Sequence, residues 1–84
     1  MNQAIQFIDH IEFRSNTQQL LFFGQVNGLM IECIIDVSHY AFIDETAAQT
    51  YFENYRFDYE ELAEQLIEDE EYNSAGQIEL TRIF

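Results

Sequence analysis

The sequence predicts an α+β fold, in which an antiparallel meander sheet is covered on one face by two consecutive helices and a C-terminal strand returns to the sheet. Three observations support this prediction. Asn27-Gly28 lies between two apolar runs, the spacing of apolar residues becomes helical after Thr46, and apolar residues alternate with polar ones after Gly76. With 84 residues, the chain is expected to form a single domain over residues 1–84.

A β-hairpin forms the centre of the predicted sheet. Residues 20–26 and 29–35 are rich in side chains that favour strands, and Asn27-Gly28 supplies the positive φ angles of a type I′ turn. A two-residue loop fixes the register, and the pairs on one face are all apolar: Val26 with Leu29, Gly24 with Ile31, Phe22 with Cys33, and Leu20 with Ile35. The reverse face is mixed and is expected to be only partly covered. It carries Leu21, Phe23 and Gln25 opposite Ile34, Glu32 and Met30.

Shorter strands are expected on both sides of the hairpin. Their residues alternate between apolar and polar side chains or form brief apolar runs. They span residues 5–7, 11–13 and 40–43, with a last strand over 78–83.

A first helix is predicted over about residues 47–55. Thr46 and Gln49 match a capping box, in which each side chain satisfies a backbone N–H at the start of the helix. Apolar and aromatic side chains then recur at helical spacing.

A second helix is expected to follow a hinge at Arg56 and Phe57. Asp58 suits the N-cap position, and the helical pattern continues to about Tyr72. Residues 73–76 include Asn and Gly, which tolerate the left-handed conformation that ends many helices.

The charge of the chain argues against some classes of function. Sixteen acidic residues against three arginines give a net charge of −13, which argues against binding to nucleic acid or to anionic lipid. No apolar run is long enough to span a membrane, and no basic segment precedes an apolar run, so we expect a cytoplasmic protein. The single cysteine, Cys33, excludes an internal disulfide and a cysteine-built zinc site.

The sequence also lacks the motifs of common enzymes. It contains no glycine-rich phosphate loop, no nucleophile elbow, no His-Glu-His metal motif and no calcium loop. We therefore predict no catalytic residues, no cofactor and no metal site, and we favour a protein that is not an enzyme.

Carboxylates gather on one side of the second predicted helix. At 100° per residue they fall within an arc of roughly 100°, opposite the apolar side. They are Glu60, Glu61, Glu64, Glu68 and Glu71. Such a face either keeps the protein soluble or docks onto a basic partner. The leading hypothesis is a small acidic protein-interaction module whose partner is a protein with a basic surface.

Two other functions remain open. A small enzyme or ligand binder would place its site near Cys33, a histidine and the tyrosine cluster, which comprises Tyr51, Tyr55 and Tyr59. The histidines are His10 and His39. A homodimer would cover the apolar residues of the reverse sheet face, which are Leu21, Phe23, Met30 and Ile34.

Each arginine is expected to pair with a carboxylate. Arg56 has Glu53 and Glu60 within helical reach. Arg14 precedes a polar turn and Arg82 lies in the last predicted strand, and neither belongs to an anion-binding motif.

Several short segments together resemble the small bacterial family known as domain of unknown function 1488. They are residues 1–7, the turn Val26-Asn27-Gly28, Cys33 in the next strand, residues 56–61, and Ala63-Glu64. The resemblance covers nearly the whole chain. It implies an α+β domain with an antiparallel sheet and helices, and it supplies no catalytic residues, because no activity is established for the family.

The chain departs from the family pattern at four places. Ile8 stands where a proline is common, and Phe57 and Gln77 stand where tryptophans are common. Ala41-Phe42 replaces an Arg-Phe pair. If the family shares a function that uses its common proline, tryptophans or arginine, this chain has lost that function or performs it with other residues.

Overall fold

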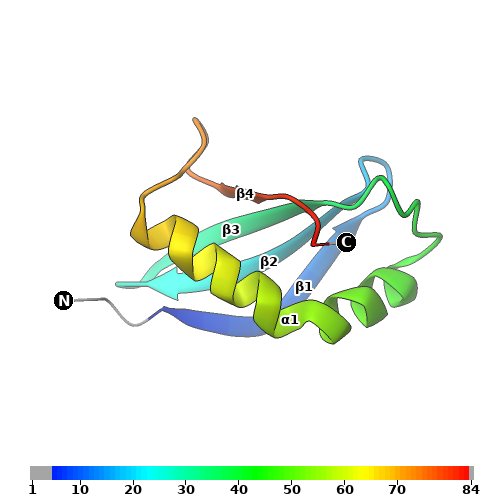
Figure 1. The fold of residues 1–84 in the computed structure, drawn as a ribbon, viewed down its shortest axis with the longest axis horizontal. Coiled ribbons are helices and arrows are strands. Elements are labelled where there is room, and N and C mark those ends of the chain that lie inside the picture. The colour runs from blue at the N-terminus through cyan, green and yellow to red at the C-terminus, as the bar shows by residue number, and fades with distance from the viewer. Residues whose placement is uncertain (1–4, 84) are drawn as a thin grey trace.

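The computed structural model describes residues 5–83 and shows one helix lying across one face of a four-stranded sheet (Figure 1). The sheet order follows the sequence, β1-β2-β3-β4. The elements are β1 (Gln6–Arg14), β2 (Gln19–Val26), β3 (Leu29–Asp36), α1 (Glu45–Glu68) and β4 (Ile78–Leu80).

The β2–β3 hairpin confirms the predicted turn and register. Asn27 and Gly28 have φ angles of 52° and 79°, as the two-residue turn requires. Phe22 pairs with Cys33, and the flanking pairs follow the predicted register throughout both strands.

The sheet is mixed, so the prediction of a wholly antiparallel sheet was wrong. The first three strands pair antiparallel, but β4 runs parallel to β3, with Cys33 opposite Ile78 and Ile35 opposite Leu80. The long connection through α1 permits a parallel return, which a short turn does not. β4 is also shorter than predicted, because residues 81–83 lie outside it.

Residues 5–13 were expected to hold two short strands but contribute to the single strand β1. Its register with β2 shifts between Phe7 and Ile11, so the interruption seen in the sequence becomes an irregularity within one strand.

The strand predicted over 40–43 is absent. Ala41 has a φ of 51°, which breaks an extended strand. The side-chain amide of Gln18 instead takes the place of a neighbouring strand. It accepts a hydrogen bond from the Phe42 N–H (2.9 Å) and donates one to the Phe42 carbonyl (3.1 Å).

One kinked helix replaces the two predicted helices. Only Tyr55 departs from helical geometry, with φ −122° and ψ 16°, and neither proline nor glycine lies there. Arg56, Phe57 and Asp58, which were expected to form the hinge and second N-cap, are helical residues. The observed N-cap is Asp44, whose carboxylate accepts a hydrogen bond from the Ala47 N–H at 2.9 Å, rather than Thr46.

The helix ends four residues before the predicted Tyr72. It stops at Glu68, and Glu70 adopts the left-handed conformation with a φ of 56°. The Glu71 N–H donates to the Leu66 carbonyl at 2.9 Å, a bond typical of a helix C-cap.

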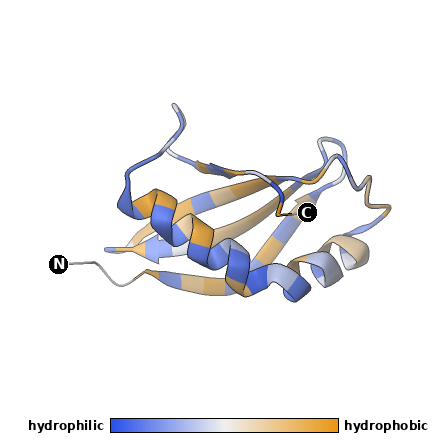
Figure 2. Ribbon diagram, in the orientation of Figure 1, coloured by the Kyte–Doolittle hydropathy of each residue, from blue (hydrophilic) through white to orange (hydrophobic). Residues whose placement is uncertain are grey.

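The main core lies between α1 and the facing side of the sheet, where apolar segments of the two elements meet (Figure 2). Phe22 of β2 and Phe52 of α1 are both buried, with ring centroids 5.1 Å apart. The other buried members are Ile11, Leu20, Ile31, Cys33, Ile35, Val37, Ala48, Tyr51, Tyr59, Ala63, Ile67, Ile78 and Leu80.

The reverse face is better covered than expected. Leu21, Phe23 and Ile34 are buried in a second cluster, against which Ile8 packs. Of the four residues expected to be exposed there, only Met30 is, at 54%. The apolar surface that a homodimer was expected to cover is thus largely buried in the single chain.

Replacing Gly28 with alanine is expected to lower the free energy of unfolding by about 1 kcal/mol. A Cβ atom at Gly28 would meet no other atom within 4 Å, so the cost comes from the φ of 79° alone. Urea unfolding measures it. Asn27→Gly is the control and should be nearly neutral, because glycine accepts the positive φ. An unchanged midpoint for Gly28→Ala would contradict the assigned turn.

Candidate functional site

Four residues form an exposed stripe along the second half of α1. We call Phe57, Glu61, Glu64 and Glu68 the acidic stripe. Their spacing places them within an arc of roughly 60° on a regular helix. All four are exposed, and in the described part of the chain the three carboxylates form no hydrogen bond or ion pair. The stripe therefore presents unneutralised charge to solvent.

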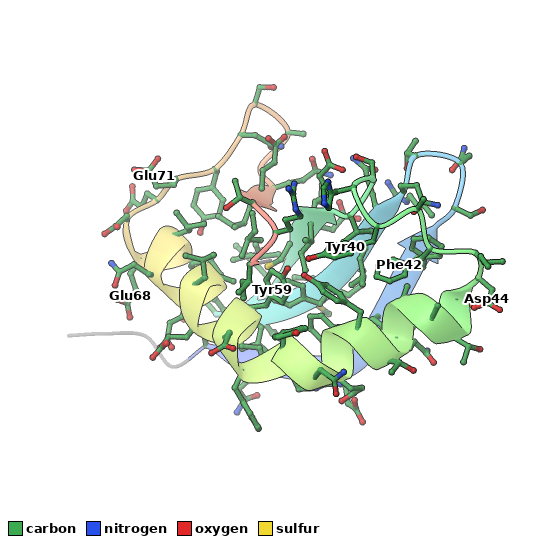
Figure 3. All side chains as sticks on the ribbon, turned by 45° about the vertical axis from the view of Figure 1, so that its right-hand side comes forward. Tyr40, Phe42, Asp44, Tyr59, Glu68 and Glu71 are labelled. Carbon is green, nitrogen blue, oxygen red and sulfur yellow. The ribbon has the colours of Figure 1, made fainter. Side chains whose placement is uncertain are left out.

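The acidic stripe contains three of the five carboxylates predicted to share a helix face. Glu60 is only partly exposed and lies 3.6 Å from an Arg56 nitrogen. Glu71 follows the end of α1, because the helix stops at Glu68 (Figure 3). The structure therefore narrows the candidate surface to Glu61, Glu64 and Glu68.

Phe57 is the member of the stripe that sequence reasoning missed. Its side chain is 81% exposed, which is unusual for a large aromatic residue. The sequence predicts a hinge between two helices at Phe57. A hinge residue has no defined helix face, so Phe57 was not grouped with Glu61 and Glu64. The helical segment after Tyr55 places the ring at the N-terminal end of the stripe, one turn before Glu61.

A shallow groove borders the acidic stripe. It has a volume of about 610 Å³ and is lined by Asp58, Glu61, Leu62, Gln65 and Ile83. Leu62 was expected on the buried side of the helix but remains 36% exposed. The groove thus has apolar side chains beside carboxylates, and Glu61 belongs to both surfaces.

Arg56 joins the helix to β1. Its guanidinium lies 3.1 Å from the Asp9 carboxylate, contacts Glu53, and lies over the Phe52 ring with 5.1 Å between Cζ and the centroid. The predicted pairing with Glu53 and Glu60 is confirmed. The hydrogen bond to Arg56 lowers the pKa of Glu53, whereas burial raises the pKa of Glu60. This arginine therefore has a structural role within the chain.

The predicted tyrosine cluster is part of the core. The Tyr51 and Tyr59 hydroxyls form a hydrogen bond, and the Tyr59 hydroxyl accepts another from the Ile83 N–H at 2.9 Å. Burial, together with the nearby Tyr59 and Tyr40 hydroxyls, raises the pKa of Tyr51. The buried Tyr40 hydroxyl has no hydrogen-bond partner among residues 5–83. Figure 3 shows Tyr40 and Tyr59 between the helix and the sheet.

Cys33 and the histidines do not form a reactive pair. Burial raises the pKa of the Cys33 thiol to about 12, and the sulfur lies 3.9 Å from the Ile31 carbonyl. His10 is exposed beside Glu12, and His39 contacts the Tyr40 ring. Neither the groove nor the larger cavity at β4 is lined by Cys33, a histidine or a tyrosine.

The described residues were also compared with the requirements of a metal site and of a membrane-spanning helix. Among residues 5–83, no three His, Cys, Asp or Glu side chains are grouped as metal ligands. The helix found in that range is not apolar enough to cross a membrane.

Arg56→Gln is expected to lower the free energy of unfolding at pH 7 by about 1 kcal/mol, mainly through lost packing and the contact with Phe52, because solvent screens its ion pairs. The pKa of Glu53 lies below 4.5 in the folded protein, so its contribution is present above pH 4.5 and is lost as the pH falls. Urea titrations at several pH values should therefore show a smaller effect in acid.

Arg14→Gln is the matched control for this variant. Arg14 is exposed and forms no ion pair within residues 5–83, so its replacement should leave stability and its pH dependence nearly unchanged. An Arg56→Gln effect that is as large at pH 3 as at pH 7 would contradict the ionic part of the interpretation.

The Cys33 thiol is expected to resist thiol reagents. With a pKa of about 12 instead of 9.0, its thiolate population at pH 8 is roughly a thousandfold lower than that of an exposed cysteine. Reaction with Ellman's reagent should be at least about a hundredfold slower in the folded protein than in guanidinium chloride. Equal rates would revive a reactive-cysteine site.

Comparison with known proteins places these features in a family. The family model described as protein of unknown function, DUF1488, matches residues 5–80. The uncharacterized protein YrdB of Escherichia coli K12 is 37% identical over 82 residues, covering 93% of this chain and 96% of YrdB. YrdB of Shigella flexneri is 36% identical with the same coverage.

A solved structure agrees with this assignment. The crystal structure of a DUF1488 protein of unknown function from Shewanella loihica PV-4 matches with a TM-score of 0.86 and 34% identity, and the match covers 98% of this chain and 97% of that one. The resemblance found in the sequence is confirmed, and the chain belongs to the DUF1488 family, whose function is unknown.

Proposed function

We propose that this protein is a non-enzymatic interaction module, and that it binds a protein with a basic surface through the acidic stripe and the adjoining groove. The observation that carries the proposal is the exposure of Phe57 on the same helix face as three unpaired carboxylates, at the N-terminal end of their row. We expect it to act in the cytoplasm.

Charge supports this assignment. A net charge of −13 attracts a basic partner from a distance, and the stripe gives that attraction a definite place on the molecule. Like charges at helical spacing destabilise the helix, and here no basic side chain within residues 5–83 relieves them. The stripe therefore opposes the stability of the isolated chain, as a binding surface often does.

The apolar elements supply the second part of the argument. Exposed aromatic residues are frequent anchors of protein interfaces, because burying the ring removes a large apolar area from water. Phe57 provides such a ring, and Leu62 with Ile83 provides an apolar part of the adjacent groove. A partner with basic residues around an apolar pocket fits both features.

The alternatives receive less support. Neither the groove nor the cavity at β4 is lined by Cys33, and burial raises the pKa of its thiol. A homodimer through the reverse sheet face would find Leu21, Phe23 and Ile34 already buried, and two such acidic chains repel each other.

Affinity capture with matched baits tests the proposal. Wild-type protein, Phe57→Ala and a triple variant with Glu61, Glu64 and Glu68 changed to Gln would be compared in cytosol of the source bacterium at low and high salt. A partner that binds the stripe should be lost with both variants. Its affinity, measured with the purified partner, should fall about tenfold or more for Phe57→Ala.

A second triple variant provides the control. Glu12, Glu45 and Glu70 are exposed and lie outside the stripe, so changing them to Gln alters the net charge equally. The partner should remain bound to this control. A partner lost equally with both triple variants would show that only net charge matters, and one unaffected by Phe57→Ala would exclude the aromatic anchor.

A further inference from the structure

An open cavity lies at the edge of the sheet where β4 ends. It is open to solvent and has a volume of about 770 Å³. Its lining combines both signs of charge with apolar side chains: Gln19, Ile34, Asp36, Glu79, Leu80, Thr81, Arg82 and Ile83. None of these residues belongs to the acidic stripe, and Ile83 is the one residue that the cavity shares with the adjoining groove.

Arg82 is the cationic member of the cavity lining. It is exposed and makes no hydrogen bond or ion pair within residues 5–83, although its charge contributes to lowering the pKa of Asp36. The carboxylate partner that the sequence led us to expect for each arginine is therefore not observed for Arg82 in the described range. Its planar guanidinium is suited to binding a carboxylate through two parallel hydrogen bonds.

A second free arginine lies at the same end of the sheet. Arg14 pairs in register with Gln19, and Gln19 pairs with Asp36, so the three side chains form one row on the face away from α1. Arg14 is also exposed and without an ion pair in the described range. Arg14 does not line the cavity, so it serves as a reference for Arg82.

The carboxylates of the cavity retain free binding capacity. One oxygen of Asp36 accepts a hydrogen bond from the Ser38 N–H at 2.9 Å, and one oxygen of Glu79 accepts one from the Asn73 amide at 2.8 Å. Each carboxylate accepts more than one hydrogen bond, so both remain able to bind an ammonium group. Ile83, which is partly exposed, provides apolar surface in the same lining.

We propose that this cavity binds a free α-amino acid with an apolar side chain. Arg82 binds the α-carboxylate, Asp36 or Glu79 binds the α-ammonium, and the apolar side chain packs against Ile83. The net charge of −13 would repel a simple anion. A simple cation would be repelled by Arg82 and would leave its guanidinium without a partner. A zwitterion carries no net charge and satisfies both kinds of group.

Titration of the 15N-labelled protein with L-leucine, followed by two-dimensional NMR, tests the proposal. Saturable shifts are expected for amides within residues 34–36 and 79–83. Two analogues keep the apolar part but lose one charge: 4-methylpentanoate lacks the ammonium, and 3-methylbutylamine lacks the carboxylate. Each should bind about tenfold or more weakly, since each loses charge-assisted hydrogen bonds.

Two arginine variants locate the binding site. Arg82→Gln should weaken leucine binding about tenfold or more. Arg14→Gln makes the same charge change outside the cavity lining and should weaken it by no more than about twofold. Absence of saturable shifts, equal binding of 4-methylpentanoate, or unchanged binding by Arg82→Gln would each overturn the proposal. The analogue comparison uses the wild-type protein, so it stands if a variant fails to fold.

The cavity contains no residue of the acidic stripe and shares Ile83 alone with the groove, so leucine binding and capture of a protein partner are tested separately. Loss of leucine binding with intact capture of a partner would overturn the amino-acid site alone. Glu64→Gln should leave leucine binding unchanged, since Glu64 lies outside the lining of the cavity.

Discussion

Burial of one apolar sheet face beneath α1 determines the rest of the structure. Phe22, Cys33 and Ile35 from the sheet and Phe52 and Tyr59 from the helix are each no more than 1% exposed. Removing such side chains from water is the main favourable contribution to the fold of a chain this small. It also sets the orientation of the helix: with these rings facing the sheet, the acidic stripe faces solvent.

The sequence predicted the structure most accurately where neighbouring residues allow a single backbone conformation. Asn27-Gly28 allows a two-residue turn, and that turn fixes every pair of the β2–β3 hairpin. The direction of β4 was not predictable in this way, because apolar and polar residues alternate equally in parallel and antiparallel strands. Its parallel pairing with β3 depends on where α1 brings the chain back.

The predicted start and end of the helix were wrong for a different reason. Asp44 and Thr46 are both good caps, and only the folded chain decides between them in favour of Asp44. The end of the helix is set by the left-handed Glu70, a residue with no special preference for that conformation. The absent strand over 40–43 likewise depends on the distant amide of Gln18, which the sequence pattern does not reveal.

The candidate site was predicted in outline and corrected in detail. Helical spacing identified Glu53 and Glu60 as partners of Arg56, but not Asp9, which is 47 residues away in the sequence. Arg56 consequently removes Glu60 from the free carboxylates. Phe57 was overlooked because a hinge was expected at its position, so its exposed aromatic ring was not considered part of the surface.

From the parallel pairing of β4 we expect this strand to join the sheet late in folding. The β2–β3 hairpin closes a two-residue loop, whereas Cys33 meets Ile78 only after the whole helix has been placed. Contacts between such distant residues form late, because closing a long loop costs conformational entropy first. Until then the edge of β3 offers unpaired backbone groups to other chains, a common start of aggregation. The charge of −13 keeps partly folded chains apart during that interval.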